Sequence, residues 1–376
     1  MLHSAKWNGG LVSPFEMGKD MLSRRPFPTI CELKKGGSMP SHTDPLFDRA
    51  AGCLMGQIAG DSLGGLVEFC SPATIRERYP DGPRLLEDGG TWNILAGQPT
   101  DDSEMALMLA RLLAGAVGYD AEDARRRYLF WLESRPFDMG RTIALGLRGH
   151  PDPDSQANGA LMRVSPLGIF GATRHWQDVA RWAQQDAALT HAHPVCRQAN
   201  ALYACLIAQA IGSGDSPQDL YAWLLRLARR QRLEPCLYEI LELAPHEAPA
   251  DYVHKMGWGR IALHNALWQL LHAPTLEEGV VDTVRRGGDT DTNAAICGAL
   301  LGAVYGLEAI PAQWRQAILA CRPQAGRPGV HHPRPDCFWP VDVPDLVPRL
   351  LEDRRDFRWE RFCSTEDDLP TLIRKS

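Results

Sequence analysis

Long apolar runs are missing from this sequence of 376 residues. No stretch reaches the roughly 20 residues that a membrane-spanning helix needs. The N-terminus also lacks the continuous apolar segment of a secretory signal peptide. We therefore expect a soluble, cytoplasmic protein that has no membrane among its partners.

Closely spaced cysteine pairs are absent as well. The chain has ten cysteines but no C-x-x-C pair, which argues against a zinc ribbon or a thioredoxin-type redox site. Several of them, such as Cys205 and Cys297, fall within apolar helical patterns. We expect these cysteines to be buried, reduced thiols.

The sequence also has no surplus of positive charge. Its 40 Lys and Arg residues are outnumbered by 46 Asp and Glu residues, which leaves a net charge of −6. Nucleic acid is bound through basic surfaces, so it is not an expected partner. A local basic pocket for a small phosphate ligand is compatible with this balance.

Strand-like alternation is scarce, whereas helical periodicity runs through the chain from Pro45 onward. The apolar spacing predicts one helix that begins at Pro45. It predicts further helices near residues 103–116, 121–133, 159–171, 176–188, 195–211, 217–231, 259–271, 275–285, 291–306, 311–320 and 344–352. Short Gly/Pro connections between them favour an all-α, compact single domain.

The first 44 residues differ from the rest in composition. They are rich in Gly, Pro, Ser and Lys, and their helical periodicity is poor. Such a segment is either a flexible leader or an arm that becomes ordered on a partner. We predict an extended arm over residues 1–44, one domain over 45–352 and a C-terminal tail over 353–376.

Two acidic clusters lie at predicted helix starts: Thr100-Asp101-Asp102-Ser103 and Gly287-Gly288-Asp289-Thr290-Asp291-Thr292. Helix capping by Asp, Ser and Thr would explain either cluster alone. Capping needs only one side-chain acceptor, however, and adjacent carboxylates repel one another unless a cation lies between them. Mg²⁺ and Mn²⁺ prefer oxygen ligands, and the two glycines allow a sharp turn. Together the clusters predict a carboxylate-rich metal site.

Three other segments carry polar groups in apolar surroundings. In Gly60-Asp61-Ser62-Leu63-Gly64 the glycines indicate a helix end and turn, or a site in which the following Glu68 reaches a metal or ligand. Gly159 is predicted to open a helix whose free N–H groups bind phosphate, while Arg163 could instead pair with an acid. His191 and His193 have the spacing of a zinc pair, but without a third ligand they favour capping or ligand contact.

These motifs, taken in order, resemble the ADP-ribosylglycohydrolases. The resemblance rests on "GQIAGDSLGGLVEF", "TDDSEM", "NGALMRVSPLG", "THAHP" and "RRGGDTDTNAAICGALLGAVYG" and covers roughly residues 45–345. The last motif is the most specific of the five. The resemblance implies a compact all-α fold with a binuclear Mg²⁺ or Mn²⁺ centre.

The resemblance also implies a role for individual residues. The implied metal ligands are Thr100, Asp101, Asp102, Asp289, Asp291 and Thr292. The implied catalytic groups are Glu68, Asp101, Asp102 and Asp289. The residues expected to support the site or contact ADP-ribose are Asp61, Asn158, Gly159, Ala160, Leu161, Met162, His191, Trp258, Gly287 and Gly288.

The sequence departs from the family pattern in three places. Ser103 stands where Thr is common, "QANGALMR" replaces a more glycine-rich loop, and the leader of 44 residues is not part of the usual domain. The second departure bears on the backbone contacts that this loop makes with the ligand. All six implied metal-ligand positions are retained, so we expect an active enzyme.

The implied reaction is metal-dependent hydrolysis that releases ADP-ribose from a modified protein, with arginine as the preferred linkage. Asp102 or Glu68 would act as the base, and a carboxyl group would protonate the leaving group. One alternative is an immunity-type protein that binds an ADP-ribosyltransferase toxin through residues 1–44, a role compatible with hydrolysis. The other is a metal-dependent phosphohydrolase that uses the same carboxylates.

Overall fold

The computed structural model describes residues 44–352. Within that range the chain is helical and contains no strand, only two isolated bridges, Gly89–Ile94 and Ala157–Trp258. The all-α prediction is therefore confirmed. The predicted tail and all of the arm except Asp44 lie outside the described residues. No helix in the described part is long and apolar enough to cross a membrane.

The helices follow one another with connections that vary in length, from a single residue, as at Val164, to residues 79–100. In chain order they are α2 (Pro45–Gly64), α3 (Pro72–Arg78), α4 (Asp101–Leu113), α5 (Ala121–Glu133), α6 (Arg141–Leu147), η2 (Asn158–Arg163), α7 (Ser165–Gly171), α8 (Trp176–Ala188), α9 (Pro194–Ser213), α10 (Pro217–Arg229), α11 (Pro235–Leu243), α12 (Gly259–His272), α13 (Leu276–Arg285), α14 (Thr290–Tyr305), η3 (Leu307–Ala309), α15 (Ala312–Ala320), η4 (Asp336–Phe338) and α16 (Val343–Leu350).

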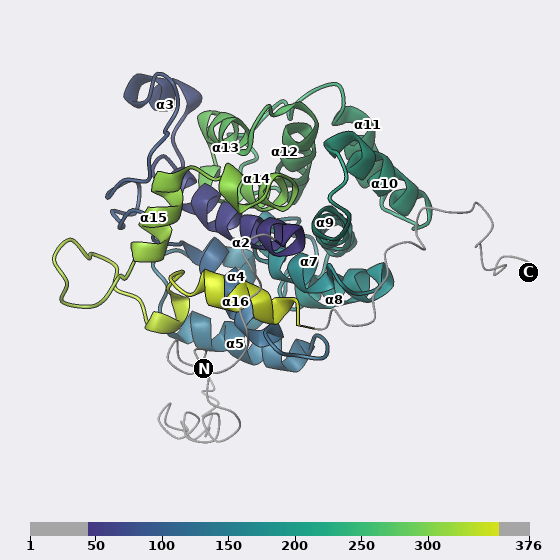
Figure 1. The fold of residues 1–376 in the computed structure, drawn as a ribbon, viewed down its shortest axis with the longest axis horizontal. Coiled ribbons are helices and arrows are strands. Elements are labelled where there is room, and N and C mark those ends of the chain that lie inside the picture. The colour runs from purple at the N-terminus through teal and green to yellow at the C-terminus, as the bar shows by residue number, and fades with distance from the viewer. Residues whose placement is uncertain (1–43, 353–376) are drawn as a thin grey trace, which may run out of the picture.

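Helices α2 and α14 form the centre of the molecule, where they lie side by side (Figure 1). On one side α12 and α13 pack against α14, and on the other α4 and α16 contact α2. Helix α9 contacts α14 and is covered by α7 and α8. The other helices are arranged around this central pair. The contact between α2 and α14 therefore fixes the relative positions of the residues at the ends of the two helices.

Local capping explains where several helices begin. At α10 the side chain of Ser216 accepts a hydrogen bond from the backbone N–H of Asp219, and Pro217 occupies the first position. This is the start predicted from the sequence, because Ser satisfies a free N–H and Pro needs none. Ser71 caps α3 and Asp120 caps α5 in the same way.

The described helices differ from the predicted ones in detail. The short helices α3, α6 and α11 were not expected, because seven to nine residues carry too little periodicity to stand out. The helix predicted over 159–171 is divided at Val164 into η2 and α7, since Pro166 cannot continue a helix across this point. The helix end expected within Gly60–Gly64 falls at the last residue of that segment, since α2 continues through Gly60 and ends at Gly64.

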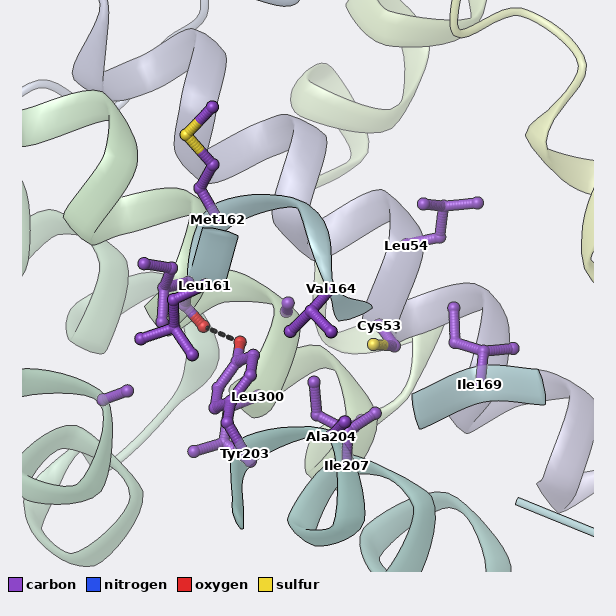
Figure 2. Close-up of a cluster of buried hydrophobic side chains, with 14 of the residues drawn as sticks. Cys53, Leu54, Leu161, Met162, Val164, Ile169, Tyr203, Ala204, Ile207 and Leu300 are labelled. Carbon is purple, nitrogen blue, oxygen red and sulfur yellow. Dashed lines mark hydrogen bonds between the residues drawn. The ribbon is translucent and has the colours of Figure 1, made fainter. Parts of the chain in front are cut away.

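A packed apolar cluster supports η2 from below (Figure 2). Leu161 and Met162 are buried there, close to side chains from α2, α7, α9 and α14. Tyr203 of α9 donates a hydrogen bond to the carbonyl of Ile296 at 2.5 Å. Close packing of this kind leaves little freedom for the overlying backbone. The segment that begins at Asn158 is thus held in a fixed position.

The described cysteines are all free thiols. Cys205 and Cys297 have exposed fractions of 1% and 0%, which confirms the prediction that they are buried. Burial raises the pKa of both thiols. Their role is therefore to fill the core.

Candidate metal centre

Glycines bring α2 and α14 into backbone contact. A Cβ placed on Gly56 or Gly60 would overlap the backbone carbonyls of Gly298 or Ala294, and one on Gly64 would overlap the backbone of Asp291. The hydroxyl of Thr290 also donates to the Gly64 carbonyl at 2.7 Å. Because only glycine permits this approach, the start of α14 lies directly against the end of α2.

Asp61 joins α4 to the same pair of helices. It is fully buried on α2, and its carboxylate accepts hydrogen bonds from the backbone N–H groups of Thr100 and Ser103 at 3.0–3.2 Å. The hydroxyl of Thr100 donates to it as well, at 2.9 Å. Burial raises the pKa of Asp61 to about 6, although these hydrogen bonds oppose the shift. Asp61 thereby caps α4 from another helix.

This arrangement bears on the choice between capping and metal binding for the two acidic clusters. Neither Thr100 nor Asp289, the N-cap residues of α4 and α14, makes a side-chain capping hydrogen bond. At α4 the capping role is taken by Asp61. The carboxylates of Asp101 and Asp102 are therefore not needed to cap their own helix.

Three carboxylates from two segments converge on one point. Glu68, Asp289 and Asp291 each offer an oxygen, and these atoms lie within 4.8 Å of one another. Asp291 is 1% exposed and Glu68 5%. Burial and the neighbouring charge of Glu68 raise the pKa of Asp291 well above its usual range. A divalent cation bound among the three carboxylates would offset their mutual repulsion, because its positive charge balances their negative charges.

Asp101 and Asp102 extend the acidic cluster. Both are buried, and burial together with nearby carboxylates raises the pKa of each well above its usual value. Asp102 Oδ1 has no hydrogen-bond partner, while Oδ2 lies 3.1 Å from Thr100 Oγ1. A buried oxygen without a partner is costly, and a hard cation would satisfy it. The donor set therefore fits Mg²⁺ or Mn²⁺.

Asp138 is an acidic residue that sequence reasoning missed. It is half-buried, and its charge raises the pKa of Glu68, Asp101, Asp102 and Asp291. Burial in turn raises the pKa of Asp138. It stands alone between Phe137 and Met139 in a connection between helices. No local pattern marks such a residue, because only the fold brings it to the cluster.

Aromatic rings line the same edge of the cluster. Trp92 Nε1 donates to Glu68 Oε2 at 2.5 Å. The Trp92 ring contacts Phe69 edge-on, with centroids 6.5 Å apart, and Phe137 at 5.9 Å. Phe137 in turn lies 4.9 Å from the His332 ring. This aromatic row ties the segment of Glu68 to the segment of Asp138, and neither Trp92 nor Phe137 was predicted from the sequence.

Asn158 brings η2 to the acidic cluster. Its side-chain amide donates to Asp289 Oδ2 at 2.8 Å. Gly159 follows, and a Cβ there would lie 2.9 Å from Ile143 and 3.2 Å from His191. Ala160, Leu161 and Met162 are buried. Contact between this segment and ADP-ribose stays a prediction.

Gly287 and Gly288 form the turn before Asp289. Their φ angles are 74° and 77°, a conformation that favours glycine. Gly288 donates its N–H to the Cys70 carbonyl at 3.1 Å and accepts from the Phe69 N–H at 2.8 Å. The turn thus holds the Glu68 segment beside Asp289. Direct contact of these glycines with a substrate stays a prediction.

The remaining predicted residues flank η2. His193 accepts a hydrogen bond from the Val195 N–H at 3.2 Å and so caps α9, as expected over zinc binding. Trp258 donates to Gln156 at 3.1 Å, and its ring lies 4.8 Å from Lys255 Nζ and 4.7 Å from Arg260 Cζ. The predicted contact between Trp258 and a ribose or adenine is not tested by these contacts.

Comparisons with known proteins identify the family to which the chain is similar. A sequence profile of ADP-ribosylglycohydrolases matches residues 42–330. The chain is 30% identical over 281 residues to an ADP-ribosyl-[dinitrogen reductase] glycohydrolase of Rhodospirillum rubrum, which covers 71% of this chain and 89% of that protein. It is 26% identical over 289 residues to an ADP-ribosylarginine hydrolase of Pseudomonas putida, covering 72% and 74%.

More distant and structural matches point the same way. An ADP-ribosylhydrolase of Bos taurus is 26% identical over 325 residues, which cover 72% of this chain and 88% of that one. A solved structure titled ADP-ribosylglycohydrolase-related protein complex matches with a TM-score of 0.67 and 29% identity. That match covers 82% of this chain and 99% of the other.

Proposed function

The chain belongs to the ADP-ribosylglycohydrolase family, and from that premise we propose that it removes ADP-ribose from modified arginine side chains with the help of two bound Mg²⁺ or Mn²⁺ ions. The observation that carries the proposal is the convergence of Glu68, Asp289 and Asp291 on one point. The buried carboxylates of Asp101 and Asp102 also support the proposal.

The residues that would hold the ions are Thr100, Asp101, Asp102, Asp289, Asp291 and Thr292. Bound there, divalent cations supply positive charge that orients the ribose hydroxyls and makes a water more acidic. Asp102 or Glu68 accepts the proton of that water, and another carboxyl group of the cluster protonates the leaving nitrogen. Asp138 adds a further carboxyl group that reaches the same cluster electrostatically.

The proposed preference for arginine rests on the side chains that lie near Glu68. A guanidinium group is planar and cationic, and it pairs with carboxylates and stacks on aromatic rings. Glu68 and Asp138 offer carboxylates, and the neighbouring Phe69 has an exposed fraction of 55%. The similarity to a hydrolase named for ADP-ribosylarginine supports the same substrate.

We expect the purified protein to release intact ADP-ribose from arginine-modified protein in the presence of Mg²⁺ or Mn²⁺. Chelation of the metal should abolish the release. The measurement is chromatography of the products from arginine- and serine-modified substrates. Release from serine but not arginine would refute the linkage preference, and release of phosphate in place of ADP-ribose would favour the phosphohydrolase alternative.

A second expected result concerns the hydrogen bond that holds Glu68. Trp92→Phe keeps an aromatic ring but removes the donor at 2.5 Å. Hydrogen bonds to charged groups contribute about 1.5–3 kcal/mol, so kcat/KM should fall at least about tenfold. The free energy of unfolding should fall by no more than the same amount, about 1.5–3 kcal/mol, because the ring contacts remain.

Trp268→Phe is the matched control for this variant. Trp268 lies on α12 and stacks on His272 with centroids 3.6 Å apart. The Trp268→Phe substitution should leave kcat/KM unchanged. Equal activity of Trp92→Phe and the wild type would show that Glu68 needs no support from Trp92.

A role for residues 1–44 in binding an ADP-ribosyltransferase stays a prediction, because residues 1–43 lie outside the described part of the chain. The proposal for hydrolysis does not depend on it. Each of the carboxylates named above lies within residues 44–352.

A further inference from the structure

A row of buried polar groups leads from α8 to the edge of the site. Asp186 and Arg163 form an ion pair at 3.0 Å in which both side chains are 0% exposed. Arg163 NH1 then donates to Thr190 Oγ1 at 3.0 Å. Thr190 Oγ1 lies 2.8 Å from His191 Nδ1. The Asp186–Arg163 ion pair is thus linked to His191 through the hydroxyl of Thr190.

Asp186 holds this row in place. Its Oδ1 accepts hydrogen bonds from the hydroxyls of Tyr119 and Tyr128 at 3.1 and 2.9 Å, and its Oδ2 accepts from Arg163 Nε. Its backbone carbonyl accepts from Arg163 NH2 at 2.9 Å. Buried charges are stable only when paired and hydrogen-bonded, and these bonds hold the guanidinium in its orientation.

The donors and acceptors of the row decide which nitrogen of His191 carries the proton. A guanidinium only donates, so Thr190 Oγ1 must accept from Arg163. If His191 Nδ1 also donated to Oγ1, the buried Thr190 hydroxyl proton would have no acceptor among the described contacts. Thr190 therefore donates to Nδ1. Burial and the charge of Arg163 lower the pKa of His191 to about 3, so the ring is neutral and its proton is on Nε2.

The other end of His191 lies against η2. Its Nε2 is buried and has no hydrogen-bond partner. The adjoining Cε1 lies 3.2 Å from where a Cβ on Gly159 would be. The neighbour of Gly159 is Asn158, which contacts Asp289. A buried donor without a protein partner, packed against the segment that reaches Asp289, indicates a ligand oxygen as its partner.

We propose that Thr190, Arg163 and Asp186 are positioning residues that hold His191 as a neutral Nε2–H donor to an oxygen of the ADP-ribose group. The inference rests on the proposed function for the identity of this ligand. A neutral donor suits a phosphate or hydroxyl oxygen, and a histidine with its proton on Nδ1 would present a lone pair to that oxygen instead.

The first test is the tautomer itself, measured on the full chain. Two-bond ¹H–¹⁵N spectra of protein labelled at histidine should give His191 a protonated Nε2 and an unprotonated Nδ1, with its signals assigned through His191→Gln. A protonated Nδ1 in the wild type overturns the proposal. This measurement needs no activity, so it stands even if arginine-linked ADP-ribose is not the substrate.

The second test removes the Thr190 hydroxyl, which links Arg163 to His191. Thr190→Val keeps the side-chain shape but loses the hydroxyl, and Thr190→Ser retains it. We expect the affinity for free ADP-ribose, measured by calorimetry, to fall about tenfold in the Val variant and to be restored in the Ser variant. The His191 Nδ1 resonance should also move in the Val variant, and KM should rise more than kcat falls.

Thr283→Val is the matched control, since Thr283 is also buried and hydrogen-bonded through its hydroxyl. It should lose stability without losing ADP-ribose affinity. Unchanged affinity in a folded Thr190→Val protein overturns the positioning role. Binding of ADP-ribose without hydrolysis of modified protein would instead refute the proposed reaction and leave this inference intact.

Discussion

Replacing Asp291 by asparagine is expected to lower the rate of ADP-ribose release about a thousandfold, a barrier increase of about 4 kcal/mol. Asp291 shares one point with Glu68 and Asp289, and asparagine supplies an oxygen there without the negative charge. The affinity for Mg²⁺ or Mn²⁺ should fall with the rate. Steady-state kinetics and metal titration by calorimetry measure the two effects.

The same substitution should not destabilise the metal-free protein. Burial and the charge of Glu68 raise the pKa of Asp291 in the folded state, so its ionised form opposes folding at neutral pH. Asparagine removes this cost, and the melting temperature without metal should stay equal or rise. Mg²⁺ should raise the melting temperature of the wild type but not that of the variant.

An exposed aspartate gives the control for Asp291→Asn. Asp81 lies on the surface after α3, so Asp81→Asn should retain both the rate and the stabilisation by Mg²⁺. A folded Asp291→Asn protein with wild-type turnover would mean that this carboxylate is no metal ligand. In that case the convergence of the acidic side chains would need another explanation.

The second large effect concerns the contact between the two central helices. Gly60→Ala should lower the free energy of unfolding by about 2 kcal/mol. Alanine is favoured over glycine within a helix by about 1 kcal/mol, so a net loss means that steric overlap outweighs propensity. The added Cβ would overlap the carbonyl of Ala294, which cannot rotate away as a side chain would. Urea unfolding followed by circular dichroism measures the change.

Gly118→Ala separates this overlap from the general effect of adding a methyl group. A Cβ at Gly118 would lie 3.5 Å from Trp182, an ordinary contact. Its stability should change by less than about 0.5 kcal/mol. If Gly60→Ala were as stable as the wild type, α2 and α14 would have room to separate, and glycine would not be required at this position.

The parts of the site that could be predicted are those whose residues lie close together in the sequence. Thr100-Asp101-Asp102 and Asp289-Thr290-Asp291 each gather several oxygens at a helix start, and that excess over capping was visible without coordinates. The helices with caps and clear apolar stripes, such as α10, were also predictable. Both signals depend on neighbours in sequence.

The parts that could not be predicted depend on contacts between distant segments. Gly60 looked like a helix end because glycine disfavours helices, and only the partner helix explains why α2 continues through it. Asp138 and Trp92 lie in connections without a pattern. Their importance comes from the carboxylates that the fold places beside them.

The hydrogen bond from Thr290 to Gly64 joins positions 226 residues apart, and this has a consequence for biosynthesis. A ribosome that makes the chain from its N-terminus releases Glu68 and Asp101 long before Asp289 emerges. A product that terminates before Asp289 would carry Glu68, Asp101, Asp102 and Asp138 but neither Asp289 nor Asp291, and would leave the glycine face of α2 uncovered. Such a fragment would be inert and prone to aggregate, so quality control would have to remove it.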